Sequence, residues 1–220
     1  MKPIYLLFLS FLLLGCANER VLELPEIENA EITEVLDVSP AYIFYDESQP
    51  DSTLFNRKNL IGTTNWLVNV DTRLSLKQAI PHLQYLQNKR RKASMHKNEA
   101  AKNYFTCNNT NSKNLGFIDF TDTTFLTENL EINENSNELC HLIVESMDDI
   151  MIRSLSNKIY EANFKNLEAT LSEAYKEDPG LKKLSLYFNE NLSFQDYIDI
   201  KNSLLPFAKN TSNIEFVFKP

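Results

Sequence analysis

Glycine is scarce in this sequence, with 4 residues in 220. Phosphate-binding loops need glycines so that backbone amides can approach the ligand, and a glycine-rich nucleotide site is therefore not expected. Histidine is equally rare, with 3 residues, and the sequence contains no His-Glu-x-x-His pattern and no glycine-flanked serine nucleophile. We therefore expect no cofactor and no metal, and an enzyme is not the favoured class.

Positive charge is also in short supply. The chain has 22 Lys and Arg against 30 Asp and Glu, which gives a net charge of −8. Binding to nucleic acid requires a basic face, so a nucleic-acid partner is not expected. The hydrophobic content of 43% and the aromatic content of 11% are those of a folded body rather than a disordered chain.

A long apolar run occurs only at the start of the chain. Lys2 precedes residues 4–14, which are apolar except for Ser10 and too few to span a bilayer. The run ends in Leu13-Leu14-Gly15-Cys16, which resembles the lipobox of bacterial lipoproteins. The resemblance implies export, cleavage before Cys16, and a membrane anchor through lipid on Cys16. The other interpretation is an ordinary secretory signal in which the cysteine occurs by chance.

The same resemblance suggests an address and a division of the chain. A bacterial envelope location is implied, and Ala17 after the cysteine favours the outer over the inner membrane by analogy. Residues 1–15 are then the signal peptide and residues 16–35, rich in glutamate, an acidic tether. Residues 36–220 form the globular domain.

Cys107 and Cys140 are the two cysteines left after Cys16. An exported protein enters a compartment that permits disulfides, so a Cys107–Cys140 bond is predicted. Two separate buried thiols are the other reading, because reduced cysteine packs as a small hydrophobe. His141 follows Cys140, but these residues are too few for a structural zinc site.

The pattern of apolar residues predicts an α+β fold, with a mixed sheet and helices packed on it. Ser75 and Gln78 form a capping-box pattern ahead of a helix that contains Pro81. Residues 146–176 have mostly helical spacing, and a strand, a Ser193-capped helix and a strand form the C-terminal unit. The strands are expected at residues 41–45, 65–70, 115–120, 142–144, 184–188 and 214–218.

An internal repeat is suggested by aligning Trp66 with Leu184. Leu74-Ser75 then falls on Leu192-Ser193, and both segments contain a strand, a polar loop and a serine-capped helix. We expect strand 66–70 with helix 75–89 to superpose on strand 184–188 with helix 193–205. Serine caps are common in any such unit, however, so the alignment leaves common descent open.

The C-terminal unit resembles the periplasmic domain of ExbD/TolR-type biopolymer-transport proteins. Residues 183–197 and 214–218 carry this resemblance, over about forty of the 220 residues. That family has an N-terminal transmembrane helix with a proton-coupling aspartate, whereas this chain has a lipoprotein-like signal. The resemblance therefore implies a small module that binds partners, without a proton-motive role.

The remaining candidate residues have structural interpretations as well as functional ones. Carboxylate pairs can act as acid and base or bind calcium, but they also favour loops and helix starts. A basic run at 89–92 could contact anionic lipid or an acidic partner, or end a helix in solvent. Four aromatic residues could line a ligand groove or lie in the core. These residues are Asp46, Glu47, Asp51, Asp119, Asp122, Asp148, Asp149, His82, His96, His141, Lys97, Lys102, Tyr42, Phe44, Tyr45 and Trp66.

Two classes of function are consistent with these features. The first is a membrane-anchored interaction or adaptor module that serves an envelope protein complex. The second is a hydrolase or carbohydrate-binding lipoprotein with a dispersed site. The closing strand, 214–218, either lies inside the sheet or ends it. For the adaptor we expect a free edge there or on a neighbouring strand to accept a partner strand, because Glu215 is the only guarding charge of the closing strand.

Overall fold

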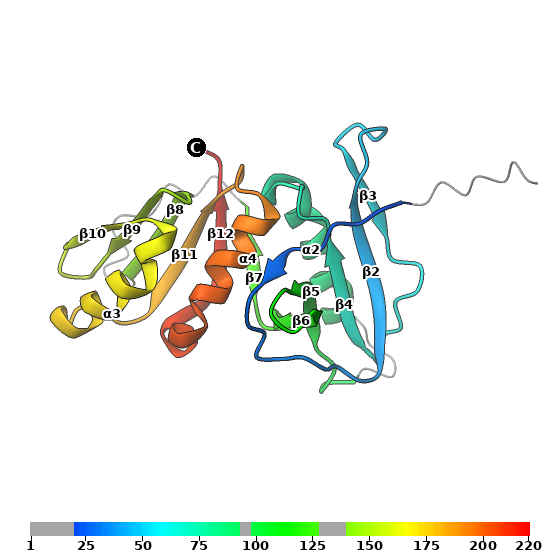
Figure 1. Ribbon diagram of the computed structural model, residues 1–220, viewed down its shortest axis with the longest axis horizontal. Helices are drawn as coiled ribbons and strands as arrows, with labels where there is room; N and C mark the ends of the chain where they lie inside the picture. Colours follow the sequence, from blue (N-terminus) through cyan, green and yellow to red (C-terminus); the bar gives the residue numbers. More distant parts are fainter. Residues whose placement is uncertain (1–19, 93–97, 128–139) are drawn as a thin grey trace, which may run out of the picture.

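The computed structural model describes residues 20–92, 98–127 and 140–220. It confirms the α+β class: two mixed six-stranded sheets carry helices. Cys16, His96 and Lys97 lie outside the described residues. In Figure 1 the two sheets lie side by side, with helices α2 (Leu76–Arg91) and α4 (Phe194–Ser203) near the line where they meet.

The first sheet is built on three parallel strands in the order β5-β4-β2. The antiparallel strand β3 extends it beyond β2, β6 pairs antiparallel with β5, and β1 pairs parallel with β5. These strands are β1 (Glu26–Ile27), β2 (Val38–Tyr45), β3 (Thr53–Asn56), β4 (Asn65–Val70), β5 (Asn103–Asn109) and β6 (Asn114–Asp119).

The second sheet has the order β10-β9-β8-β11-β12-β7. Strands β8, β11, β12 and β7 are parallel, and β9 and β10 continue the sheet by antiparallel pairing. Helix α3 (Leu167–Glu177) and the short helices η2 (Phe164–Asn166) and η3 (Leu205–Asn210) complete the fold. The strands are β7 (Thr124–Leu126), β8 (Cys140–Ser146), β9 (Asp149–Arg153), β10 (Ile159–Ala162), β11 (Leu184–Asn189) and β12 (Thr211–Phe218).

The starts of α2 and α4 are joined directly. Ser75 and Ser193, the N-caps of the two helices, form an isolated antiparallel bridge. The amide of Leu76 donates to the carbonyl of Leu192 at 2.9 Å, and the amide of Phe194 donates to the carbonyl of Leu74 at 2.7 Å. The first amides of a helix lack partners within it, so each helix start is satisfied by the other half of the chain.

The sheets share an order of elements around this junction. A hairpin, a parallel strand, a capped helix and a further parallel strand follow one another as β2-β3-β4-α2-β5 in the first sheet. The second has β8-β9-β11-α4-β12, with β10 and α3 inserted. The aligned serines of the predicted repeat are the two that form the bridge. Superposition of the two units stays a prediction.

The prediction of a mostly helical segment at 146–176 is wrong over its first half. Asp148 lies in the hairpin turn between β8 and β9, and Asp149 begins β9 rather than a helix. Ile150 and Ile152 are buried while Asp149 and Met151 are exposed, which is the alternation of a strand. The spacing of Ile152, Leu155 and Ile159 imitates a helical pattern only because two short strands follow each other.

The expected free edge on the closing strand is also wrong. Strand β12 pairs with β11 on one side and with β7 on the other. The edge was expected because the contribution of β7, a strand of three residues, is not visible in the local sequence. Glu215 does not guard an edge, since it is fully buried and accepts hydrogen bonds from Tyr197 and Lys201 of α4.

We predict that Glu215→Gln lowers the free energy of unfolding by about 2–4 kcal/mol, because it leaves the Lys201 ammonium without its buried counter-charge. Glu190→Gln is the matched control. It removes an ion pair of 3.4 Å to Lys77, whose side chain is 62% exposed, and should cost less than about 1 kcal/mol. Urea denaturation measures the free energy of unfolding of both variants. Equal decreases would show that the buried ion pair of Glu215 does not stabilise the fold more than an exposed one.

Candidate functional site

An acidic cleft of about 1110 Å³ lies between an N-terminal segment and helices α3 and α4. Five carboxylates line it, and none of the described lining residues is a lysine, arginine or histidine. Glu23 pairs with Arg73 just outside the lining, and the other four carboxylates have no ion pair among the described residues, which favours a cationic occupant. The carboxylates are Glu23, Glu26, Glu28, Glu168 and Asp199.

The N-terminal wall of the cleft is a segment that the sequence suggested was a free tether. Residues 23–30, here called the strap, are instead packed on the domain: β1 pairs with β5, and Ile27 is only 4% exposed. In Figure 1 the strap, in dark blue, passes beside α4. The predicted tether over residues 16–35 is thus too long, because alternate buried residues of the strap complete the first sheet.

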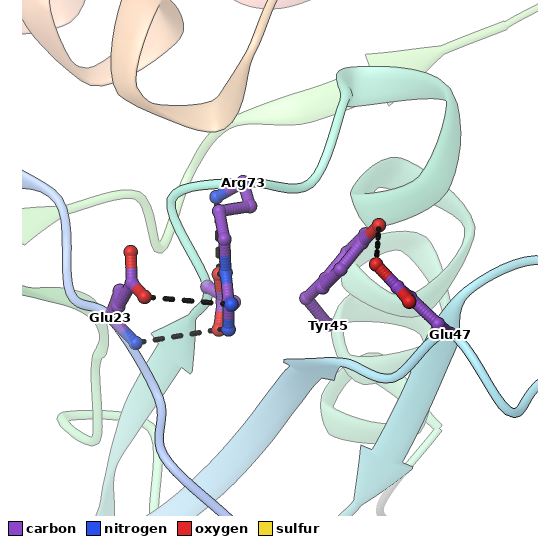
Figure 2. Close-up of polar contacts among 5 residues, drawn as sticks. Glu23, Tyr45, Glu47 and Arg73 are labelled. Carbon is purple, nitrogen blue, oxygen red and sulfur yellow. Dashed lines mark hydrogen bonds and ion pairs between the residues drawn. The ribbon is translucent and has the colours of Figure 1, made fainter.

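A buried carboxylate fixes the start of the strap. Asp71, fully buried after β4, accepts hydrogen bonds from Arg73 Nε at 2.8 Å and Nη2 at 2.7 Å. The Glu23 amide donates to Asp71 Oδ2 at 3.4 Å, and its carboxylate lies 3.5 Å from Arg73 Nη1 (Figure 2). These hydrogen bonds lower the pKa of Asp71 against the opposing effect of burial. Arg73 also lies 4.9 Å from the centre of the Tyr45 ring, which borders this cluster.

Helix α4 forms the opposite wall. The Gln195 side chain accepts from the Glu26 amide at 2.8 Å and donates to the Glu26 carbonyl at 2.9 Å, so it binds the strap as a neighbouring strand would. One turn later, half-buried Asp199 accepts from Gln195 at 2.8 Å. Burial raises the pKa of Asp199, and the nearby charges of Asp196 and Glu26 raise it further.

The helical wall presents one hydrogen-bond acceptor without a donor and one carboxylate in an unfavourable setting. Asn202 also lines the cleft, and its buried Oδ1 atom has no partner among the described residues. Asp199 carries a charge that its surroundings disfavour. A bound ammonium or guanidinium group would supply donors and positive charge, and would relieve the repulsion among the carboxylates.

The predicted disulfide is not present. Cys107 lies in β5 of the first sheet and Cys140 in β8 of the second, and both are free, buried thiols. Burial raises the pKa of Cys107 to about 12, which keeps it protonated and unreactive. The Cys140 sulfur lies 3.3 Å from the Gly180 carbonyl oxygen and 3.3 Å from the Lys182 amide nitrogen. Separate buried thiols, the other reading of the sequence, are what the structure contains.

The carboxylate pairs that the sequence offered as candidates do not line the acidic cleft. Asp46 accepts from Ser48, Asp51 from Thr53, and Asp119 from Lys102 at 2.8 Å. These are local turn and ion-pair contacts away from the acidic cleft. Over the described ranges, no group of three or more histidine, cysteine, aspartate or glutamate side chains could hold a metal ion.

Of the two histidines that the structure describes, His82 lies beside a hydroxyl and a carboxylate. Its Nε2 atom lies 3.1 Å from Thr53 Oγ1, which in turn donates to Asp51 Oδ2 at 2.8 Å. Thr53 is only 6% exposed and its single proton is given to Asp51, so it is not poised as a nucleophile. His141 is buried beside Tyr187, and burial lowers the pKa of both histidines.

The basic run at the end of α2 is partly a structural element. The Arg90 guanidinium stacks on Trp66 at 3.9 Å and donates to Asn103 Oδ1 at 2.7 Å. Trp66 is 2% exposed, and Tyr42 stacks on Phe44 with ring centres 5.6 Å apart. These aromatic residues do not line the acidic cleft.

No protein-family model, no curated protein and no solved structure matches this chain. The function must therefore be inferred from the geometry of the cleft. Sequence reasoning missed Glu168, Gln195 and Asp199, although the acidic composition of residues 19–34 was a signal that could have identified the strap wall.

We predict that Asp199→Asn stabilises the protein at pH 7 by about 0.5 kcal/mol, after allowing for solvent screening of a half-buried group. The raised pKa means that the folded state disfavours the carboxylate. The wild-type chain regains this stability as the pH falls through the folded pKa towards 3.8, so the advantage of the variant should vanish in acid.

Asp196→Asn is the control with the opposite sign. Asp196 accepts from the Ser193 amide at 3.1 Å and from its hydroxyl at 2.7 Å in the capping box, so its neutralisation should destabilise the helix. Thermal melts at pH 7 and pH 4 measure both variants. A destabilised Asp199→Asn protein at pH 7 would contradict the electrostatic description of the cleft.

Proposed function

We propose that this chain is a lipid-anchored lipoprotein of the bacterial envelope, more specifically of the outer membrane, that acts as an adaptor. Its acidic cleft docks a cationic segment of a partner protein. The observation that carries this proposal is the cleft itself: five carboxylates, no basic lining residue among those described, and a half-buried aspartate whose charge is disfavoured in the unliganded chain.

The anchor and the cleft would lie close together. The lipobox-like residues place lipid on Cys16, and the strap begins at Glu23. The chain between them spans at most roughly 25 Å when extended, so the cleft would stay near the membrane surface. None of the helices in the described ranges is long and apolar enough to cross a bilayer, and the lipid would supply the attachment.

Carbohydrate binding or hydrolysis is less well supported. Sugar sites commonly combine carboxylates with aromatic faces, but the aromatic residues that the sequence suggested for a groove lie in other parts of the fold. Phe164 is the aromatic residue found among the cleft-lining residues. The charge of the walls therefore favours a cationic peptide over a neutral sugar.

We predict that neutralising the helical wall weakens binding of a fluorescent lysine-rich peptide. The double variant Glu168→Gln, Asp199→Asn should bind at least tenfold more weakly in fluorescence anisotropy, and wild-type binding should weaken with salt. The control, Asp148→Asn with Glu161→Gln, neutralises two exposed carboxylates that do not line the cleft and should change affinity less than twofold. Equal effects of both pairs would remove the cleft as the docking site.

The anchor is tested separately. Cys16→Ala should abolish labelling by radioactive fatty acid and the normal signal cleavage, because the acceptor thiol is gone. Fusion of residues 17–220 to a non-lipoprotein secretory signal should yield soluble protein. Wild-type protein that takes up no fatty acid and leaves membranes in high salt would contradict the lipoprotein assignment.

A further inference from the structure

The strap is held mainly through its backbone. The Asn108 amide donates to the Pro25 carbonyl at 2.8 Å, and the Thr110 amide donates to the Ile27 carbonyl at 3.0 Å. Gln195 adds the paired hydrogen bonds to the backbone of Glu26. Such contacts do not depend on the side chains of the bound segment, and they are those by which a sheet accepts an added strand.

Two side chains of the strap, two residues apart, enter the protein. Pro25 and Ile27 are buried, whereas Glu26 and Glu28 between and after them are exposed. Gly116 in β6 makes room for this: a Cβ atom there would lie 2.9 Å from Ile27 Cδ1 and 2.5 Å from Ala30 Cβ. The groove between β5 and α4 thus accepts an extended backbone with two apolar side chains.

The strap is a poor electrostatic match for this groove. Its exposed residues Glu26 and Glu28 line the same cleft as Glu168 and Asp199 of the helical wall. The charge of Glu26 is one of the causes that raise the pKa of Asp199. A segment with lysine or arginine at those two positions would make the same backbone hydrogen bonds, and its positive charges would be attracted by Glu168 and Asp199 instead of repelled.

We propose that the groove between β5 and α4 is a binding site for an extended segment of a partner protein, with two apolar residues two apart and basic residues at the positions of Glu26 and Glu28. The strap is the intramolecular occupant, and the partner segment displaces it by pairing with β5. This rests on the proposed function in that the partner is cationic. It adds that the partner is attracted by Glu168 and Asp199 of the helical wall, which stay in place when the strap leaves with its three glutamates.

Displacement would also change the anchor. The strap ties the chain to the domain from Glu23 onward, while Ile32 forms the next bridge, to Phe117. Release of the strap would lengthen the connection from Cys16 by about nine residues, or roughly 30 Å when extended. Partner binding would thereby allow the domain to move further from the membrane.

Two labelled peptides test the proposal on the whole chain. The first has the sequence of residues 21–31, and the second is identical except for lysine in place of Glu26 and Glu28. The lysine peptide should bind the wild-type chain at least tenfold more tightly than the first. Ile27→Ala in the chain removes a buried side chain of the strap and leaves the groove intact, so it should tighten binding of the lysine peptide at least tenfold. Gly62→Ala should leave binding unchanged, because no atom lies within 4 Å of a Cβ at that position.

A second variant guards against misfolding. Gln195→Ala removes two backbone bonds that the strap and the peptide would make in the same way, so under strand exchange it should change the affinity of the peptide less than threefold. Hydrogen exchange on the wild-type complex should show that the amides of Glu23 and Glu26, which donate to Asp71 and Gln195 in the free chain, lose protection, whereas those of Asn108 and Thr110 keep theirs.

Three results would overturn the proposal. The lysine peptide could bind no better than the first peptide. It could bind with the strap amides still protected and gain nothing from Ile27→Ala, while still depending on Glu168 and Asp199; the cleft would then dock a cation without strand exchange, and the proposed function would survive. The chain could form a Gly116-dependent dimer in size-exclusion chromatography with light scattering, which would make a second copy the occupant.

Discussion

The bridge between Ser75 and Ser193 is the contact on which the rest of the structure depends. Two helices that belong to different sheets begin against each other, and the first amides of each donate to carbonyls of the opposite half. Helix starts that are buried without partners are unfavourable, so each half supplies what the other lacks. The two sheets thereby become one body, with α4 fixed beside the edge of the first sheet.

The acidic cleft is a consequence of that placement. Because α4 lies beside β5, Gln195 can reach the backbone of Glu26 across 169 residues of sequence and hold the strap in the first sheet. The same geometry brings Asp199 close to the glutamates of the strap, and its charge is disfavoured there. Carboxylates that repel one another in the unliganded chain favour binding of a partner whose positive charge reduces that repulsion.

The parts of the fold that depend on local patterns could be predicted from the sequence. Helices α2 and α4 begin at the predicted serines, and β4 and β11 are the predicted apolar strands. The helix predicted over residues 146–176 is wrong in its first half, because the apolar residues of two short strands happen to have helical spacing. Strand β5 was missed because its asparagines are uncommon in buried strands. Its central place in the sheet follows from pairing with β4 and β6, which the local sequence does not show.

The site could not have been predicted in the same way. Its two walls are far apart in the sequence, and the acidic composition of the strap is also that of a linker. Only Pro25 and Ile27, buried at alternate positions, distinguish a docked strand from a tether, and the space for Ile27 depends on Gly116 in another strand. The prediction of a free edge on β12 is wrong for a related reason, because β7, from a distant part of the chain, pairs with that edge.

A distance measurement between the two sheets shows whether they form one rigid body. Spin labels at the exposed positions Lys58, after β3, and Lys158, before β10, report on opposite ends of the molecule. If the junction at Ser75 and Ser193 makes one body, double electron–electron resonance should give a single narrow distance distribution. A broad or two-peaked distribution in the wild-type chain would show that the halves move independently and would contradict the account of the cleft.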